Sequence, residues 1–127
     1  MDNTILIVDD EPDLVSMVKM RLEANNYNIL TASSGEEALI KAKSAKPDLI
    51  LLDIEMPGLT GLETLRRLKD NLETKSTAVI MLTAKGDPAS ISEAGRLGVS
   101  YYLRKPFDTE ELLSMVNKSI SGGQEEG

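Results

Sequence analysis

The sequence predicts an α/β fold: a single domain in which an open, doubly wound sheet of five parallel strands is flanked by five helices. Five short apolar runs alternate with stretches of helical periodicity along the 127 residues. The runs are almost continuously apolar, which is typical of parallel strands covered by helices on both faces. A closed barrel of eight strand-helix units needs about 250 residues, so an open sheet is expected.

The first strand is predicted at residues 4–8, a β-branched apolar run that ends at Asp9. The period then becomes helical, and Pro12 stands where the first turn of a helix tolerates a missing N–H. The apolar positions of this helix are Leu14, Met17, Val18 and Leu22. A second strand is predicted at residues 27–32.

The second helix is predicted to begin after Ser34 and to run to about Ala45. Ser34 is followed three residues later by Glu37, a spacing that favours a capping box. The third apolar run, residues 48–52, is predicted as a strand that ends at Asp53.

A Pro-Gly turn at residues 57–58 separates this strand from the third helix. The helix is marked by the apolar residues Leu62, Leu65, Leu68 and Leu72. Its solvent side carries Arg66, Arg67 and Lys69. The fourth strand is predicted at residues 78–82 and ends at Thr83.

An Asp-Pro pair at residues 87–88 is predicted to cap and start a short fourth helix. Its apolar residues are Ile91, Ala94 and Leu97. The last strand, residues 100–103, has the weakest pattern. Asp108 and Glu111 are then expected to cap the final helix. The apolar face of that helix consists of Leu112, Leu113, Val116 and Ile120.

The domain is expected to occupy residues 1–121. Residues 122–127 are Gly- and Glu-rich and are predicted to form a disordered tail, as a linker stub, a natural end or an expression remnant.

Composition excludes several classes of chemistry. The chain has no cysteine and no histidine, which excludes disulfides, thiolate catalysis, a Ser-His-Asp triad and histidine-ligated zinc. Fourteen basic residues against 21 acidic ones argue against direct nucleic-acid binding. No apolar run approaches the ~18 to 20 residues that span a bilayer, and no secretory signal is recognisable. A soluble, cytoplasmic protein that does not bind membranes is therefore expected.

Polar residues gather where the predicted strands end. They are Asp9, Asp10, Glu11, Asp53, Thr83 and Lys105. In an open parallel sheet these positions share one edge, where ligands bind. Taken singly, each has an ordinary explanation as a helix cap, a turn hydroxyl or a surface charge.

Asp53 is the exception, because an ionised carboxylate at the end of an apolar run needs a counter-charge. Asp9 and Asp10 nearby increase that need, and clustered carboxylates suit Mg²⁺, or Mn²⁺. Lys105 could add positive charge. A phosphoryl group could then approach Asp53, which would act as the nucleophile, while Thr83 donates to a phosphoryl oxygen.

Together these residues resemble the receiver domains of two-component response regulators, including the single-domain chemotaxis-type regulators. The resemblance rests on residues 7–11 (IVDDE), 52–58 (LDIEMPG) with Gly61, 82–84 (LTA) and 105–107 (KPF). It extends from about residue 4 to residue 120. It implies the flavodoxin-like strand order 2-1-3-4-5.

The resemblance also implies a role for each site residue. Asp53 is the expected phosphoacceptor. The expected Mg²⁺ ligands are Asp10, Asp53 and the backbone carbonyl of Glu55, with Asp9 acting through water. Lys105 is expected to contact the phosphoryl group, and the Lys105-Pro106 peptide bond is expected to be cis. Thr83 and Tyr102 are expected to form a coupled switch, although Tyr102 could equally be an edge-strand aromatic residue with its hydroxyl in water.

The implied function is that of a phosphorylation-activated switch rather than an enzyme, although the domain would assist its own phosphorylation and dephosphorylation. The implied phosphodonor is a sensor histidine kinase or a histidine phosphotransfer protein. The implied recipient of the signal is an effector protein or a covalently linked output domain, reached through residues 88–120. A phosphorylation-dependent dimer is left open.

Three competing functions are weighed. A phosphatase or phosphotransferase of the haloacid-dehalogenase type would need an Asp-x-Asp pattern after the first strand, which the sequence around Asp9 lacks. A flavin-binding protein would need a Ser-, Thr- or Gly-rich phosphate loop there. An unphosphorylated interaction module would be expected to have lost Asp53 or Lys105.

Glu55 and Lys85 each lie two residues beyond a site residue. We hypothesise that their opposite charges pair across the mouth of the pocket and hinder attacking water, which would slow the loss of phosphate. The ordinary alternative is an exposed ion pair.

Overall fold

The computed structural model describes residues 3–84 and 88–125, in which strands and helices alternate along the chain. The elements are β1 (Thr4–Val8), α1 (Pro12–Glu23), β2 (Asn28–Ala32), α2 (Gly35–Ala45), β3 (Leu49–Asp53), α3 (Gly61–Lys69), β4 (Ala78–Thr83), α4 (Pro88–Arg96), β5 (Tyr101–Arg104) and α5 (Thr109–Glu125). The predicted strands and helices are therefore present in the predicted order.

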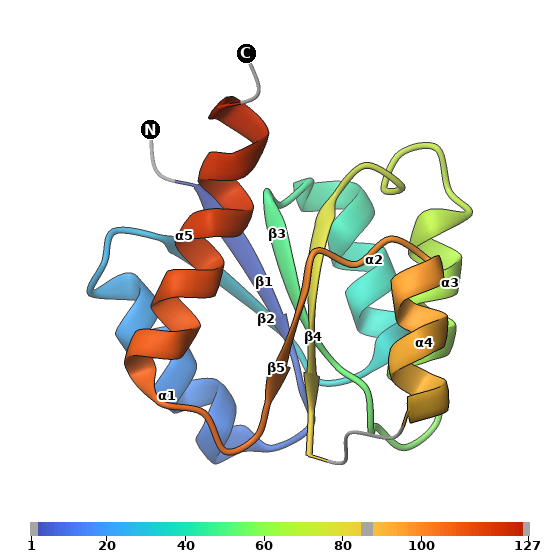
Figure 1. Ribbon diagram of the computed structural model, residues 1–127, viewed down its shortest axis with the longest axis horizontal. Coiled ribbons are helices and arrows are strands. Elements are labelled where there is room, and N and C mark those ends of the chain that lie inside the picture. Colours follow the sequence, from blue (N-terminus) through green and yellow to red (C-terminus); the bar gives the residue numbers. More distant parts are fainter. Residues whose placement is uncertain (1–2, 85–87, 126–127) are drawn as a thin grey trace.

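The strands form one sheet in the order β2-β1-β3-β4-β5, and every neighbouring pair is parallel. The chain passes from β1 through α1 to β2 on one side, and then from β2 through α2 back past β1 to β3 on the other side. The strand order therefore reverses at β1. Ligand sites in open α/β sheets lie at such a reversal, beyond the carboxyl ends of the strands. These ends point to the lower edge of Figure 1.

Helices cover both faces of the sheet. Helices α1 and α5 lie on one face, and α2, α3 and α4 lie on the other (Figure 1). Alternate residues of each inner strand contribute to the two apolar clusters, as the two-residue period of a strand requires. In β3, for example, Leu49 and Leu51 face the α1 and α5 side, whereas Ile50 and Leu52 face the other side. All residues of β3 are buried, which explains its uninterrupted apolar run.

The start of α2 differs from the predicted capping box. The hydroxyl of Ser34 accepts a hydrogen bond from the backbone N–H of Glu37, as expected. The Glu37 carboxylate, however, accepts from the N–H and the hydroxyl of Ser33 rather than from Ser34. A reciprocal capping box occurs instead at α3, where Thr60 and Glu63 bond to each other's backbone N–H.

Helix α3 ends earlier than the leucine spacing predicts. Its last residue is Lys69, and Leu72 lies beyond it with 83% of its surface exposed. The backbone leaves the helix at Asp70, and the next residues form turns that Thr74 fixes by donating to the carbonyl of Leu68. The i+4 spacing of Leu68 and Leu72 is therefore fortuitous.

Helix α5 continues to Glu125, past residue 121, where the sequence predicts a disordered tail to begin. Once a helix is nucleated, each added residue gains one backbone hydrogen bond, so a helix can extend into a segment of low intrinsic propensity. Its last turns project beyond the sheet (Figure 1). Within the described residues, no helix has the length and apolar character needed to cross a bilayer.

Candidate functional site

The carboxyl ends of β1, β3, β4 and β5 bring the predicted site residues together. Asp9 follows β1, Asp53 is the last residue of β3, Thr83 is the last residue of β4, and Lys105 follows β5. Backbone hydrogen bonds continue past the strand ends, from Ile54 N to the carbonyl of Leu82 and from Lys105 N to that of Thr83. The hydrogen-bonded edge of the sheet therefore fixes the backbone positions from which these side chains extend.

Three carboxylates form a compact cluster at this edge. One oxygen from each of Asp9, Asp10 and Asp53 lies within 4.8 Å of the others. Asp9 and Asp53 are only 2% exposed, whereas Asp10 is exposed. Burial, and then the negative charge of Asp9, raise the pKa of Asp53 to about 7, although Lys105 and the N–H of Glu55 favour its ionised form. The cluster therefore contains more negative charge than its surroundings stabilise.

Among the residues that the structure describes, Lys105 is the cation in contact with the acid cluster. Its Nζ lies 2.9 Å from Asp9 Oδ2, 2.9 Å from Glu11 Oε1 and 3.5 Å from Asp53 Oδ1. Burial would lower the pKa of Lys105, but the hydrogen bonds to Asp9 and Glu11 and the charge of Asp53 outweigh it and raise that pKa above its ordinary value. The peptide bond between Lys105 and Pro106 is cis. One ammonium group thus bridges three carboxylates.

Glu55 links the β3 and β4 ends through its side chain. Its Oε2 accepts from the Thr83 hydroxyl at 2.9 Å, and its Oε1 accepts from Ala84 N at 3.1 Å. Its own N–H donates to Asp53 Oδ1 at 3.2 Å. Sequence reasoning singled out Glu55 for its backbone carbonyl and for a pairing with Lys85, and it missed these contacts. Lys85 lies outside the described residues.

The loop after β3 is held close to the strand end by Gly61. Gly61 N donates to the carbonyl of Ile54, and a Cβ on Gly61 would lie 2.1 Å from the backbone oxygen of Asp53. Gly58, in the same loop, has a φ of +74°, which glycine adopts at little cost. The predicted turn at residues 57–58 therefore returns the chain so that α3 starts directly beside Asp53.

Tyr102 lies on β5, away from the acid cluster. Its half-buried ring packs against the apolar cluster under α2, α3 and α4, and its hydroxyl donates to the carbonyl of Ile91 in α4. Burial raises the pKa of this hydroxyl. Tyr102 therefore connects the edge strand to α4.

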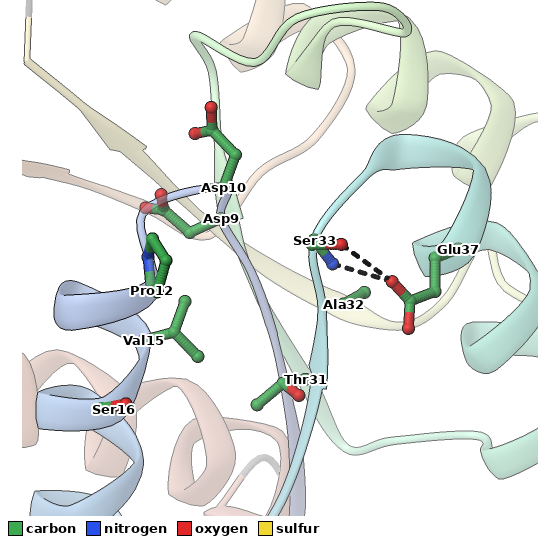
Figure 2. Close-up of a pocket in the computed structure, with 9 residues that line it drawn as sticks. All are labelled: Asp9, Asp10, Pro12, Val15, Ser16, Thr31, Ala32, Ser33 and Glu37. Atoms are coloured by element: carbon green, nitrogen blue, oxygen red, sulfur yellow. Dashed lines mark hydrogen bonds between the residues drawn. The ribbon is translucent and has the colours of Figure 1, made fainter.

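A pocket of about 290 Å³ opens beside the acid cluster, between α1 and the turn that follows β2. Figure 2 shows Asp9 and Asp10 at one end of it and Glu37, hydrogen bonded to Ser33, at the other. Pro12, Val15 and Thr31 line its floor and sides. The carboxylate of Asp10 is thus accessible from solvent.

Known proteins are similar to this chain in sequence. The alkaline phosphatase synthesis transcriptional regulatory protein PhoP of Bacillus subtilis is 40% identical over 116 residues, which is 91% of this chain and 48% of PhoP. Protein PilH of Pseudomonas aeruginosa is 37% identical over 118 residues, which is 93% of this chain and 98% of PilH. The chain thus spans about half the length of PhoP and nearly all of PilH.

Solved structures agree with the fold. The CheY-like receiver domain protein of Methanospirillum hungatei has a TM-score of 0.94 and 26% identity, with 100% of both chains covered. The receiver domain of the sensor histidine kinase PA1611 of Pseudomonas aeruginosa has a TM-score of 0.87 and 26% identity, with 95% of this chain and 99% of that one covered. It holds a magnesium ion in its active site cleft. The family model for the response regulator receiver domain matches residues 5–117. The chain therefore belongs to the receiver domains of two-component response regulators.

Proposed function

We propose that this chain is a signalling switch in which Asp53 accepts a phosphoryl group from a sensor histidine kinase or a histidine phosphotransfer protein. The observation that carries the proposal is the buried Asp53 carboxylate, which lies beside two further acids and 3.5 Å from the ammonium group of Lys105. A carboxylate oxygen of Asp53 would attack phosphorus while the phosphorus–nitrogen bond of the phosphohistidine breaks. The leaving imidazole would keep the bonding electrons and take up a proton.

The acid cluster fits a divalent cation. Its donors are hard carboxylate oxygens, and two of the three acids, Asp9 and Asp53, are buried and in contact with Lys105. Asp10, Asp53 and the backbone carbonyl of Glu55 would hold Mg²⁺, or Mn²⁺, with Asp9 acting through water. When bound, the cation would neutralise charge on the carboxylates and on the phosphoryl oxygens. The magnesium site of the PA1611 receiver domain supports this assignment.

Two groups of the chain would bind the phosphoryl oxygens. Lys105 can turn from Asp9 and Glu11 toward a group on Asp53, because it already lies near all three. The Thr83 hydroxyl and the Ala84 N–H both donate to the carboxylate of Glu55, whose own N–H donates to Asp53, and this supports placing them beside the same group. They would donate hydrogen bonds to the oxygens that phosphorylation adds.

The output would follow from the same contacts. Thr83 ends β4 and Tyr102 ties β5 to α4, so a shift of Thr83 toward a phosphoryl group could change the surface formed by α4, β5 and α5. We propose that this surface binds an effector protein or an output domain, with no direct nucleic-acid contact by this chain. Relatives that are about twice as long and are named transcriptional regulators support a linked output domain.

The test is exposure of the protein to acetyl phosphate with Mg²⁺, followed by measurement of intact mass. We expect the parent to gain the mass of one phosphoryl group and to lose it again on acid treatment. The control Asp70→Asn, in which an exposed aspartate is replaced in the same way, should behave as the parent does. Asp53→Asn should gain no such mass. Equal labelling of the parent and Asp53→Asn would refute the role of Asp53, and labelling without Mg²⁺ would refute the need for the metal.

A further inference from the structure

The donors that would bind a phosphoryl group are already engaged by an anion. Both carboxylate oxygens of Glu55 are used: Oε2 accepts from the Thr83 hydroxyl at 2.9 Å, and Oε1 accepts from Ala84 N at 3.1 Å. A carboxylate presents two oxygens to these two donors much as two oxygens of a phosphoryl group would. Charge-assisted hydrogen bonds of this kind are among the stronger ones in proteins.

The backbone of Glu55 is fixed beside Asp53, whereas its side chain is held by the two hydrogen bonds of its carboxylate. Its N–H donates to Asp53 Oδ1 at 3.2 Å, so the residue cannot move far from the acceptor carboxylate. Its side chain is only partly buried and can therefore swing into water. Thr83, in contrast, is 3% exposed and is fixed at the end of β4. Of the two partners, Glu55 is the one that can leave.

We propose that the Glu55 carboxylate is an internal competitor for the oxyanion site formed by the Thr83 hydroxyl and the Ala84 N–H. Uptake of a phosphoryl group on Asp53 requires Glu55 to release both donors. This inference rests on the proposed function, and it assigns Glu55 a regulatory role that neither a metal ligand nor a surface ion pair would have. The strength of the competition sets how readily the site accepts a phosphoryl group.

The first experiment measures binding of the beryllium trifluoride anion with saturating Mg²⁺. This anion has the charge and shape of a phosphoryl group. We expect release of the two contacts to cost the parent about tenfold in affinity. Water replaces part of each contact, so the net effect is set near that of one hydrogen bond to a charged group. Glu55→Ala should therefore bind the anion about tenfold more tightly than the parent, and Glu55→Gln, which keeps an oxygen but no charge, should fall between them. Glu73→Gln removes the same charge at the opposite edge of the sheet and should bind as the parent does.

The second experiment needs neither metal nor phosphodonor. The backbone amide of Ala84 is followed by ¹⁵N NMR and by hydrogen exchange in an Asp53→Asn background, with and without Glu55→Ala. We expect the Ala84 signal to shift and its exchange to become faster when Glu55 is removed, while amides in β1 remain unchanged. Unchanged β1 amides also establish that the variant is folded.

The two experiments separate this inference from the proposed function. An Ala84 amide that does not respond to Glu55→Ala would overturn the inference, whatever acetyl phosphate does at Asp53. Equal or weaker anion binding by Glu55→Ala in a folded protein would overturn it as well. A responsive Ala84 amide in a protein whose Asp53 is never labelled would support the contact and refute the proposed function alone.

Discussion

Replacing Asp53 with asparagine should stabilise the metal-free protein at pH 8 and have little effect at pH 4. The pKa of Asp53 rises from an ordinary 3.8 to about 7 in the folded protein, because the carboxylate is buried and lies beside Asp9. Between these two values the folded state holds a proton that the unfolded state has released. The free energy of unfolding therefore falls as the pH rises from about 4 to about 7. Above pH 7, the ionisation of Asp53 contributes little further change.

The magnitude follows from the size of the pKa difference. About 3 pKa units at 1.36 kcal/mol per unit correspond to about 4 kcal/mol, which is an upper limit. Lys105 is 3.5 Å from Asp53 and can adjust toward it, and the pocket beside the cluster admits water. We therefore expect the advantage of Asp53→Asn over the parent to grow by roughly 2 to 4 kcal/mol between pH 4 and pH 8.

The assay is urea unfolding at several pH values in the presence of a chelator, with the parent, Asp53→Asn and Asp70→Asn compared. Asp70 is exposed at the end of α3 and outside the acid cluster, so Asp70→Asn is the control for the loss of one carboxylate. Mg²⁺ at pH 8 should stabilise the parent more than Asp53→Asn. An advantage of Asp53→Asn that stays the same from pH 4 to pH 8 would show that the pKa of Asp53 is not raised, and the electrostatic reasoning would fail.

Two further predictions concern the positions that shape the site and the core, each read as a change in the midpoint of urea unfolding. Gly61→Ala should lower the free energy of unfolding by about 3 kcal/mol, because its Cβ would lie 2.1 Å from the backbone oxygen of Asp53. Gly95→Ala in α4 meets open space and should raise that free energy by up to about 1 kcal/mol. Equal effects of the two substitutions would contradict the close approach at Gly61. Leu68→Ala should lower the free energy of unfolding by about 3 kcal/mol and Leu72→Ala by less than about 0.5 kcal/mol, because Leu68 is buried and Leu72 is exposed. A large loss of stability in Leu72→Ala would contradict the early end of α3.

The inner strands β1, β3 and β4 were predictable because each is buried on both faces. In β3 every residue is buried, so its sequence is an unbroken apolar run and its end is marked by the first charged residue, Asp53. The last strand is shorter, lies at the sheet edge and has a single buried residue, Leu103, which explains why its pattern was the weakest. The strength of the sequence signal follows burial.

Helix ends were harder to predict because local hydrogen bonds decide them. Leu72 continues the spacing of Leu68, yet Thr74 captures the carbonyl of Leu68 and the chain turns away. Ser34 caps α2 as its spacing predicts, but Glu37 reaches Ser33, one residue earlier. The periodicity of apolar residues does not indicate from which of two adjacent N–H groups a flexible carboxylate accepts a hydrogen bond.

The positions of the site residues were predictable, because the ends of parallel strands must meet at one edge. The side-chain partners were not. Nothing in the sequence indicates that Lys105 bridges Asp9 and Glu11 as well as approaching Asp53, or that Glu55 turns toward Thr83. These choices depend on how the side chains pack against one another within a crowded, charged pocket, and the sequence determines them only through the whole fold.

The charges of the pocket explain why an internal competitor would be useful. Four carboxylates, those of Asp9, Asp10, Glu11 and Asp53, gather in the pocket. Among the described residues Lys105 is the cation that contacts three of them, so a divalent cation would leave negative charge in excess there. An incoming phosphoryl group must therefore be held by neutral donors as well as by cations. The Thr83 hydroxyl and the Ala84 N–H are such donors, and Thr83 is buried at the end of β4, where an unpaired hydroxyl would be costly. Glu55 satisfies them until a phosphoryl group takes its place, so the same contact that stabilises the resting protein also opposes its activation.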